Sequence, residues 1–211
     1  MAGRVLLLLT GLVGLAVSCQ SPGVSSPASQ AGELVDGPTR WLMLPDEQRD
    51  AKHLRSTQDA ILFLEAFWDR RDPDPKTPGN ELARSFYERV DAADQLYSED
   101  SQRGSLTDRG RALILLGPPS VQRYSQKRVP TWDPGQPGAK PAIESRYLTV
   151  ETWVYQRSDL APALLALLEH EAPVAEVTLA FVVEPRRTYL VEGDKVLELA
   201  VRAALRDLPE S

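Results

Sequence analysis

The chain has 211 residues, of which 42% are hydrophobic and 26% charged, and its formal net charge is −6. These proportions are typical of a soluble globular protein and fit one domain with short appendages. An acidic chain of this kind shows neither the electrostatic footprint of a nucleic-acid-binding protein nor a basic patch for anionic lipid. Its single cysteine, Cys19, excludes an internal disulfide.

Residues 1–18 predict a secretory signal. Their apolar run, residues 5–17, is too short to cross a bilayer that requires about 20 residues. The sequence LAVSC places small and apolar residues directly before Cys19, and it resembles the lipobox of bacterial lipoproteins. The resemblance implies cleavage before Cys19 and acylation of that residue, which would anchor the chain to a lipid bilayer. The alternative is an ordinary signal peptide, because Ala16 and Ser18 also fit a small-x-small cleavage site.

Residues 19–33 are rich in serine, proline and glycine. We expect them to form a flexible tether, because they cannot bury enough apolar surface to fold. Gln20 follows the cysteine, and by resemblance to enteric lipoproteins a residue other than aspartate there implies delivery to the outer membrane. We therefore expect residues 34–211 to form a single domain that faces the periplasm or is exposed at the cell surface, with a helical half (34–100) and a sheet half (101–211).

The helical half is predicted from apolar periodicity and capping residues. Pro45 and the acidic residues that follow it favour the start of a helix. Ser56 begins a capping-box pattern ahead of a helix over residues 56–69, and Asn80 can cap a further helix over residues 81–97.

Asp72 and Asp74 lie between these helices, in the sequence RRDPDP. Two carboxylates could hold a cation, but a calcium site needs further oxygen ligands, and aspartate before proline is a common turn former. We therefore expect a turn here, and neither a metal nor a cofactor in the protein.

The sheet half is predicted to begin with a turn at residues 104–110. In this turn Asp108 accepts backbone hydrogen bonds and Gly110 takes a positive φ. The nearly continuous apolar segment RALILL (111–116) predicts a strand in the middle of a covered sheet, ended by Gly117 and the two prolines after it.

The remainder predicts an irregular excursion, further strands and two helices. Four prolines in residues 125–145 predict a long irregular loop. Alternating apolar residues predict a strand over 150–156 and a hairpin over 175–193, with a short helix between them capped by Ser158 or Asp159. The C-terminal helix is predicted to face inward with Leu197, Ala200, Val201, Ala204 and Leu208. The predicted fold is α+β, with N-terminal helices packed on a small antiparallel sheet of roughly three or four strands and a C-terminal helix.

The chain contains, in this order, the segments FWDRRDPDP, NELARSFYERV, GSLTDRGRALILLGPP and ETWVYQ. Together they resemble the GWxTD-domain family of bacterial envelope proteins, over residues 44–193. The resemblance implies one folded unit and an envelope context, and it carries no activity with it. The residues that carry it are Arg71, Asp72, Asn80, Gly104, Thr107, Asp108, Arg109, Gly110, Gly117, Pro118, Trp153 and Tyr155.

Ser105 replaces the tryptophan for which this family is named. If that tryptophan packs on the domain, a neighbour must fill the space in this chain. If that tryptophan binds a ligand, this chain lacks the contact.

No pattern of residues in the sequence indicates a catalytic site. Neither histidine has a metal-ligand spacing, acylation of Cys19 leaves no thiol, and no pair of carboxylates stands out for acid–base chemistry. We expect Asp108 to brace the turn that enters the central strand, and Arg71 or Arg109 to bridge the helical half to the sheet.

Two functions are open at this point. The favoured one is a non-catalytic module, tethered to the membrane, that binds another envelope protein and no nucleic acid. The alternative is a periplasmic hydrolase that acts on peptide or glycan through carboxylates. A cleft with convergent ionisable groups would indicate the hydrolase, whereas an exposed apolar patch or a free sheet edge would indicate a partner surface.

Overall fold

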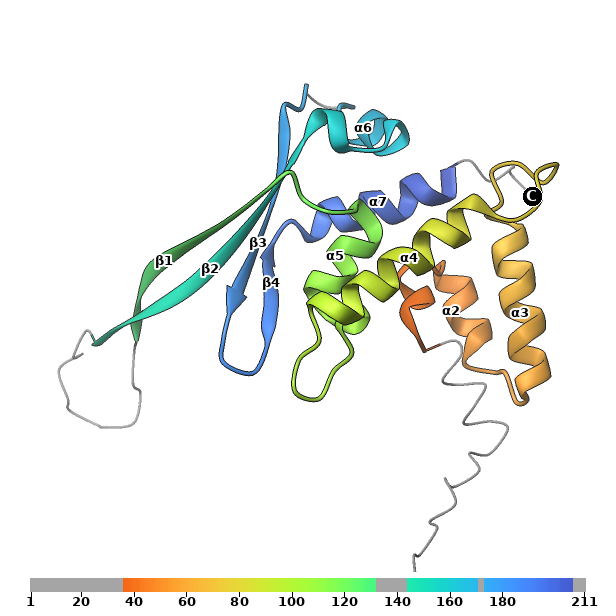
Figure 1. Cartoon of the computed structure of the whole chain (residues 1–211), viewed down its shortest axis with the longest axis horizontal. Helices are drawn as coiled ribbons and strands as arrows, with labels where there is room; N and C mark the ends of the chain where they lie inside the picture. The colour runs from red at the N-terminus through yellow and green to blue at the C-terminus, as the bar shows by residue number, and fades with distance from the viewer. Residues whose placement is uncertain (1–35, 132–143, 171–172, 207–211) are drawn as a thin grey trace, which may run out of the picture.

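The computed structural model describes residues 36–131, 144–170 and 173–206, so the predicted signal and tether lie outside the described residues. The described part contains six α-helices and a four-stranded antiparallel sheet with the strand order β1-β2-β3-β4. The helices gather on one side of the sheet (Figure 1). The predicted α+β class, with a small antiparallel sheet and a C-terminal helix, is confirmed.

The helical half begins with a 3-10 turn, η1 (Pro38–Trp41), and the helix α2 (Pro45–Ala51). Helix α3 (Thr57–Asp69) starts at Ser56, whose side chain accepts a hydrogen bond from the backbone N of Asp59 at 3.1 Å. Helix α4 (Glu81–Leu96) starts at Asn80, whose side chain accepts from the backbone N of Ala83 at 2.8 Å. Both caps are where the sequence predicts them, because a cap needs only a local side-chain oxygen.

The segment RALILL is a helix, so the predicted central strand is wrong. It belongs to α5 (Asp108–Leu116), which follows the 3-10 turn η2 (Gly104–Leu106). The Thr107 side chain caps α5 by accepting from the backbone N of Gly110 at 3.1 Å. The helix is packed on nearly every side, and its buried residues are Gly110, Ala112, Leu113, Ile114 and Leu116. A helix buried all round is as continuously apolar as a buried strand, so periodicity could not separate the two.

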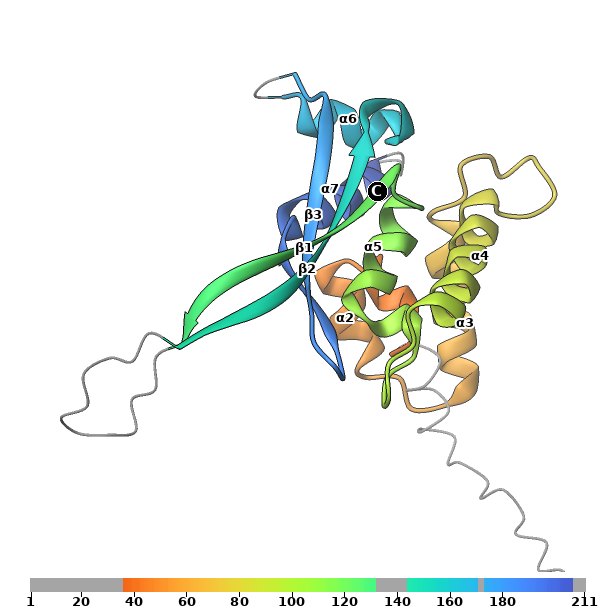
Figure 2. The same cartoon turned by 60° about the vertical axis from the view of Figure 1, so that its left-hand side comes forward.

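The irregular excursion predicted for residues 125–145 is also wrong at both of its ends. Strand β1 (Val121–Thr131) pairs in continuous antiparallel register with β2 (Glu144–Gln156), and only residues 132–143 lie outside the described part. Pro130 is tolerated because β1 is an edge strand and pairs on one side only. Before Thr149, β2 has no partner in β3, so this part of β2 and the paired part of β1 form a two-stranded ribbon that projects from the body (Figure 2).

Strands β3 (Glu176–Val183) and β4 (Thr188–Glu192) form the predicted hairpin. Helix α6 (Pro162–Leu168) is preceded by Ala161, with no side-chain cap. Ser158 and Asp159 lie in the separate 3-10 turn η3 (Arg157–Asp159), so the predicted cap is wrong. Proline at the first helical position provides the start instead.

Helix α7 (Asp194–Arg206) closes the described chain. Its buried residues are Leu197, Ala200 and Ala203, whereas Val201 and Ala204 are half-buried, so the inward face is rotated slightly from the predicted one. The predicted Leu208 lies outside the described residues.

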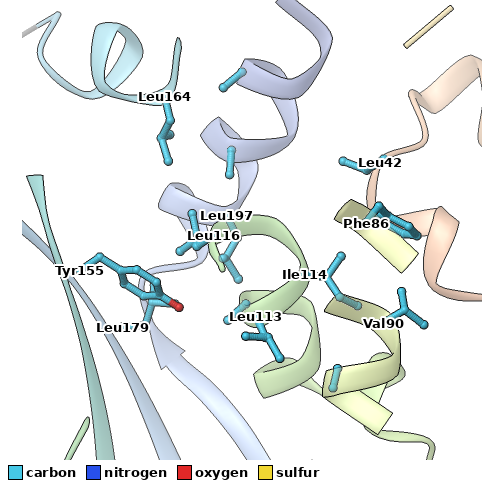
Figure 3. Packing of buried hydrophobic residues seen from close by; sticks show 14 of the residues in the cluster. Leu42, Phe86, Val90, Leu113, Ile114, Leu116, Tyr155, Leu164, Leu179 and Leu197 are labelled. Carbon is cyan, nitrogen blue, oxygen red and sulfur yellow. The ribbon is translucent and has the colours of Figure 1, made fainter. Parts of the chain in front are cut away.

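The core lies between the sheet and the helices α5 and α7 (Figure 3). The sheet contributes four fully buried hydrophobic side chains to this core: Trp153, Tyr155, Leu179 and Phe181. An aromatic cluster of Phe67, Trp68, Phe86 and Tyr87 joins α3 to α4.

Candidate functional site

Arg71 is buried at the end of α3 and holds the helical half together. Its guanidinium donates to both carboxylate oxygens of Glu47, at 2.9 and 2.5 Å, and to the backbone oxygens of Phe67 and Leu42. Burial would raise the pKa of Glu47, but hydrogen bonds from Arg71 and Arg70 outweigh it and hold that pKa below its ordinary value. Arg71 therefore joins helical elements to one another and does not reach the sheet.

Asp72 and Asn80 organise the loop between α3 and α4. Asp72 accepts a hydrogen bond from the backbone N of Asp74 at 3.1 Å, and Asp74 accepts one from the backbone N of Lys76 at 3.1 Å. Asn80 caps α4 and also donates to the backbone oxygen of Trp68 at 2.7 Å. These contacts form a turn of the kind that aspartate before proline favours.

The glycines Gly104 and Gly110 allow backbone-to-backbone contact. A Cβ on Gly104 would lie 1.9 Å from the oxygen of Ala93 in α4, and one on Gly110 would lie 1.8 Å from the oxygen of Gly104. Thr107 reinforces this approach by donating to the Gly104 oxygen at 2.7 Å. Gly110 does not have the predicted positive φ, because its role is to leave space inside a helix.

Gly117 is the motif glycine that does need a positive φ, and it takes the value 82° where α5 ends, just before Pro118. Its carbonyl oxygen accepts a hydrogen bond from the Tyr155 hydroxyl in β2 at 3.2 Å. The end of α5 is thereby attached to the sheet.

Asp108 and Arg109 attach the start of α5 to the sheet. A carboxylate oxygen of Asp108 accepts from the backbone N of Leu190 in β4 at 2.8 Å. Arg109 lies 3.5 Å from Glu151 in β2 and 3.4 Å from Glu99, and its guanidinium lies 5.1 Å from the ring centre of Tyr97. Of the two arginines considered from the sequence, Arg109 is the one that bridges the halves.

Glu99 and Glu151 converge on Arg109 and were not identified from the sequence. Glu151 is 1% exposed and accepts from Trp153 Nε1 at 2.8 Å and from the Tyr124 hydroxyl at 3.0 Å. Partial burial and the nearby Glu151 carboxylate raise the pKa of Tyr124. Glu99 accepts from the backbone N of Thr188 at 2.8 Å. The sequence did contain one indication that Glu151 is buried, because strand alternation places it on the same inward face as Trp153.

Ser105 is fully buried, and its backbone oxygen accepts a hydrogen bond from Trp41 Nε1 at 2.9 Å. The Trp41 ring in turn lies under the guanidinium groups of Arg40 and Arg111, at 4.4 and 5.4 Å from its centre. An aromatic side chain from a distant part of the sequence therefore contacts the position where the family motif has tryptophan.

The β1 edge, which we define as residues 121–131, carries a concentration of positive charge. It includes Arg123, Lys127 and Arg128 and no acidic residue. The described side chains of residues 121–128 are all exposed, and these three cations form no ion pair within the described residues. Tyr124 and Tyr147 add large exposed aromatic surface.

The histidines lie apart from these clusters. His53 is exposed and its Nδ1 contacts the backbone oxygen of Arg49 at 2.7 Å, and His170 is exposed after α6. Among the residues that the structure describes, no group of three or more His, Cys, Asp and Glu side chains is arranged to hold a metal ion. None of the described helices is long and apolar enough to cross a bilayer.

Comparison with known proteins gives one match. The family model for the GWxTD domain matches residues 27–143, which include the motif from Arg71 to Pro118 but not Trp153 and Tyr155. No curated protein and no solved structure is similar enough to match the chain. Because the family model covers more than half of the sequence, the chain belongs to the GWxTD-domain family.

Proposed function

We propose that this protein is a lipid-anchored binding module of the bacterial envelope, which holds an acidic segment of a partner protein on its β1 edge. The anchor is acylated Cys19, the tether is residues 19–33, and the domain faces the periplasm from the outer membrane. The lipobox-like LAVSC sequence and the family membership support this setting. Several acyl chains on one residue give stable anchoring, since each buried methylene contributes about 0.8 kcal/mol.

The observation that carries the binding function is the unpaired outer side of β1. This strand ends the sheet order and pairs only with β2, so one row of its backbone N–H and C=O groups has no strand partner in the described part. At about 3.4 Å per residue its 11 residues offer an edge roughly 37 Å long. Extended peptides bind such edges by adding a strand, with backbone hydrogen bonds giving affinity and side chains giving specificity.

The charge of the β1 edge selects the partner. Arg123, Lys127 and Arg128 would face like charges if two copies of this chain paired edge to edge, which is how basic residues protect sheet edges. A strand with Asp or Glu opposite them gains instead, by roughly 0.2–1 kcal/mol for each cross-strand pair. The edge therefore favours an acidic partner segment over a second copy.

The convergence of Glu99 and Glu151 supports an alternative, a carboxylate-based hydrolase acting on peptide or glycan. These carboxylates already accept from Thr188 N, Trp153 Nε1 and the Tyr124 hydroxyl, and both lie against Arg109, which favours a structural role. Incubation with peptidoglycan separates the two functions. Release of fragments by the wild-type protein but not by Glu151→Gln, with folding unchanged, would establish the hydrolase.

Anchoring is tested by fractionation of cells that express the full chain. We expect the wild-type protein in the membrane fraction, labelled by radioactive palmitate. Cys19→Ala should appear unlabelled in the soluble periplasm. A Cys19→Ala protein that is processed normally but stays with the membranes would refute the anchor.

Binding is tested by photo-cross-linking in the native envelope. A photoreactive amino acid in place of Ser125, on the β1 edge, should cross-link to an acidic segment of one envelope protein. Reversal of the charge at Arg123, Lys127 and Arg128 to glutamate should abolish that product.

A matched control reverses the same amount of charge on another surface. It replaces three exposed cations in and just after α2 by glutamate: Arg49, Lys52 and Arg55. This variant should cross-link as the wild type does. Equal loss in both variants, or cross-links only between copies of this chain, would exclude the proposed partner surface.

A further inference from the structure

A groove of about 1070 Å³ lies on the helical side of the molecule, away from the β1 edge. One wall is the N-terminal half of α4, and the other is formed by α6 and the C-terminal half of α7. Both α4 and α7 pack on α5, whose last residues contribute to the floor between them. The groove is therefore a gap in a layer of helices, bounded on both sides by helix surfaces.

The floor and the α6–α7 side of the groove are lined mainly by small and apolar side chains, whereas α4 and the segment before it contribute charged ones: Arg71, Asp72, Glu81, Arg84, Glu88 and Arg89. The alanines of the groove are Ala161, Ala163, Ala166, Ala200, Ala203 and Ala204, and its leucines come from α4, α5 and α6. Small residues allow another helix to approach closely, at the 8–10 Å axial separation usual for packed helices. The exposed acidic residues Glu88 and Asp159 lie at the rim.

Arg89 is the polar group that points to a ligand. It is half-buried in the groove, and its only hydrogen bond in the described part of the chain runs from Nη1 to the Ile114 oxygen at 3.1 Å. Arg71, which also lines the groove, is paired with Glu47, and Arg109 at the start of α5 is paired with Glu99 and Glu151, whereas Arg89 has no ion pair among the described residues. Burial lowers the pKa of Arg89, because it is held away from water without a counter-charge.

Arg89 also lies where the groove deepens. A narrow recess of about 50 Å³ between α4, α5 and α7 shares Arg89, Ser85 and Leu82 with the main groove. A carboxylate that entered the groove would therefore meet the guanidinium at its inner end, with Nε and Nη2 still available to donate.

The dimensions of the groove match those of an α-helix. From Glu81 to Arg89 the helix α4 rises about 12 Å, at 1.5 Å per residue. Two turns of an α-helix, about 11 Å long and 10–12 Å wide with side chains, occupy roughly 1000 Å³, so a groove of 1070 Å³ has room for about two turns. A single extended acyl chain would leave most of this space empty.

We propose that this groove binds a short amphipathic α-helix of another protein, which packs small apolar residues on the alanines and places one carboxylate on Arg89. Basic residues on the flanks of that helix would face Glu88 and Asp159. This site is independent of the β1 edge and of the lipid anchor.

The test is selection from a displayed library of 16-residue helical peptides against the full mature domain. The matched counter-selection uses Ala166→Trp, which adds a large ring to the groove from an exposed position of α6, and each variant is first checked for native melting temperature. We expect groove-dependent binders with an apolar stripe at positions i, i+3, i+4 and i+7 and one acidic residue at a fixed place in that stripe.

The role of Arg89 is measured with the best selected peptide and its Glu→Gln form, by fluorescence anisotropy. Arg89→Gln should weaken the acidic peptide roughly tenfold or more and should remove the preference for Glu over Gln. Arg202→Gln, an exposed arginine of α7, should leave both affinities unchanged. A preference for Glu that survives in Arg89→Gln would overturn the assignment.

Three other outcomes would also overturn it. The first is the absence of any binder that distinguishes the wild type from Ala166→Trp. The second is displacement of the peptides by palmitate at concentrations below its micelle threshold, which would make the groove a lipid site. The third is self-association of the wild-type chain that covers the groove. Because Ala166 and Arg89 lie apart from β1, these results leave the cross-linking test of the β1 edge unaffected.

Discussion

Replacement of Gly110 by alanine should destabilise the protein, although the same change inside a helix is ordinarily favourable. Alanine in a helix interior is preferred over glycine by about 0.5–1 kcal/mol, because it restricts the unfolded chain. In this structure the new Cβ would lie 1.8 Å from the Gly104 oxygen, whereas ordinary van der Waals contacts of a Cβ are 3.4–4 Å. The opposing atom is backbone, so η2 and α5 would have to separate by more than 1 Å.

The loss of folding stability follows from the packing and hydrogen bonds that this separation disturbs. Overpacking in a core costs about 1–3 kcal/mol, and loosening the Thr107 hydrogen bonds to Gly104 and Gly110 adds roughly 1 kcal/mol for each. After the propensity gain, the net loss is about 3 kcal/mol. For a domain of this length that corresponds to a fall in melting temperature of roughly 6–12 °C.

Thermal unfolding followed by tryptophan fluorescence measures this fall. Asp91→Ala, at an exposed position of α4, improves helix propensity without a steric conflict and serves as the control. Its melting temperature should stay within about 2 °C of the wild type. A Gly110→Ala protein as stable as the wild type would refute the argument that close backbone approach sets this motif position.

Three further predictions concern side chains that join parts of the fold. Ser105→Trp should lower the melting temperature because Ser105 is fully buried and Trp41 contacts it, and a second change, Trp41→Ala, should recover part of the loss. An unchanged melting temperature in Ser105→Trp would show that the site has room. Glu47 has a folded-state pKa below its unfolded value, so its contribution to stability is present above the unfolded pKa and is lost as the pH falls through the folded pKa. Urea unfolding between neutral pH and about pH 3 should show that loss in the wild type and a flatter profile in Glu47→Gln, and parallel profiles would contradict it. Glu151→Gln should lower the pKa of Tyr124 toward its ordinary value, as seen by ultraviolet titration of tyrosinate, since the carboxylate is one cause of the raised pKa; an unaltered titration would remove Glu151 as a cause.

Local signals made part of this fold predictable. Ser56 and Asn80 begin α3 and α4 because a cap is a contact between a side chain and the backbone of the next turn. The hairpin of β3 and β4 follows from alternation, which is set by one buried face. Each of these features depends on residues that are close in sequence.

Features that depend on distant contacts were not predictable in the same way. Residues 111–116 were predicted as a strand because an element buried on all sides loses its periodic signature. Residues 125–131 were predicted as irregular because of the prolines, yet pairing with β2 overrides that preference and Pro130 sits on an edge. Glu99 and Glu151 are far apart in the sequence, and only the fold brings both to Arg109.

The motif stretch from Gly104 to Gly117 connects α4, α5 and the sheet through the contacts of its own residues. Its glycines allow α4, η2 and α5 to touch, Asp108 bonds to β4, and the carbonyl of Gly117 accepts from β2. Of the two surfaces proposed for binding, the β1 edge lies outside this stretch, and the groove between α4 and α7 meets it only at the floor, through Leu115 and Leu116. Gly110→Ala should therefore weaken binding at both surfaces in proportion to the fraction of protein unfolded. Charge reversal on β1 or Ala166→Trp, at exposed positions, should instead affect one surface and leave the melting temperature and the other surface unchanged. If Gly110→Ala abolished one kind of binding while the other persisted at full affinity, the stretch would have to contact a partner directly, and its role as the junction between the two halves would not be sufficient.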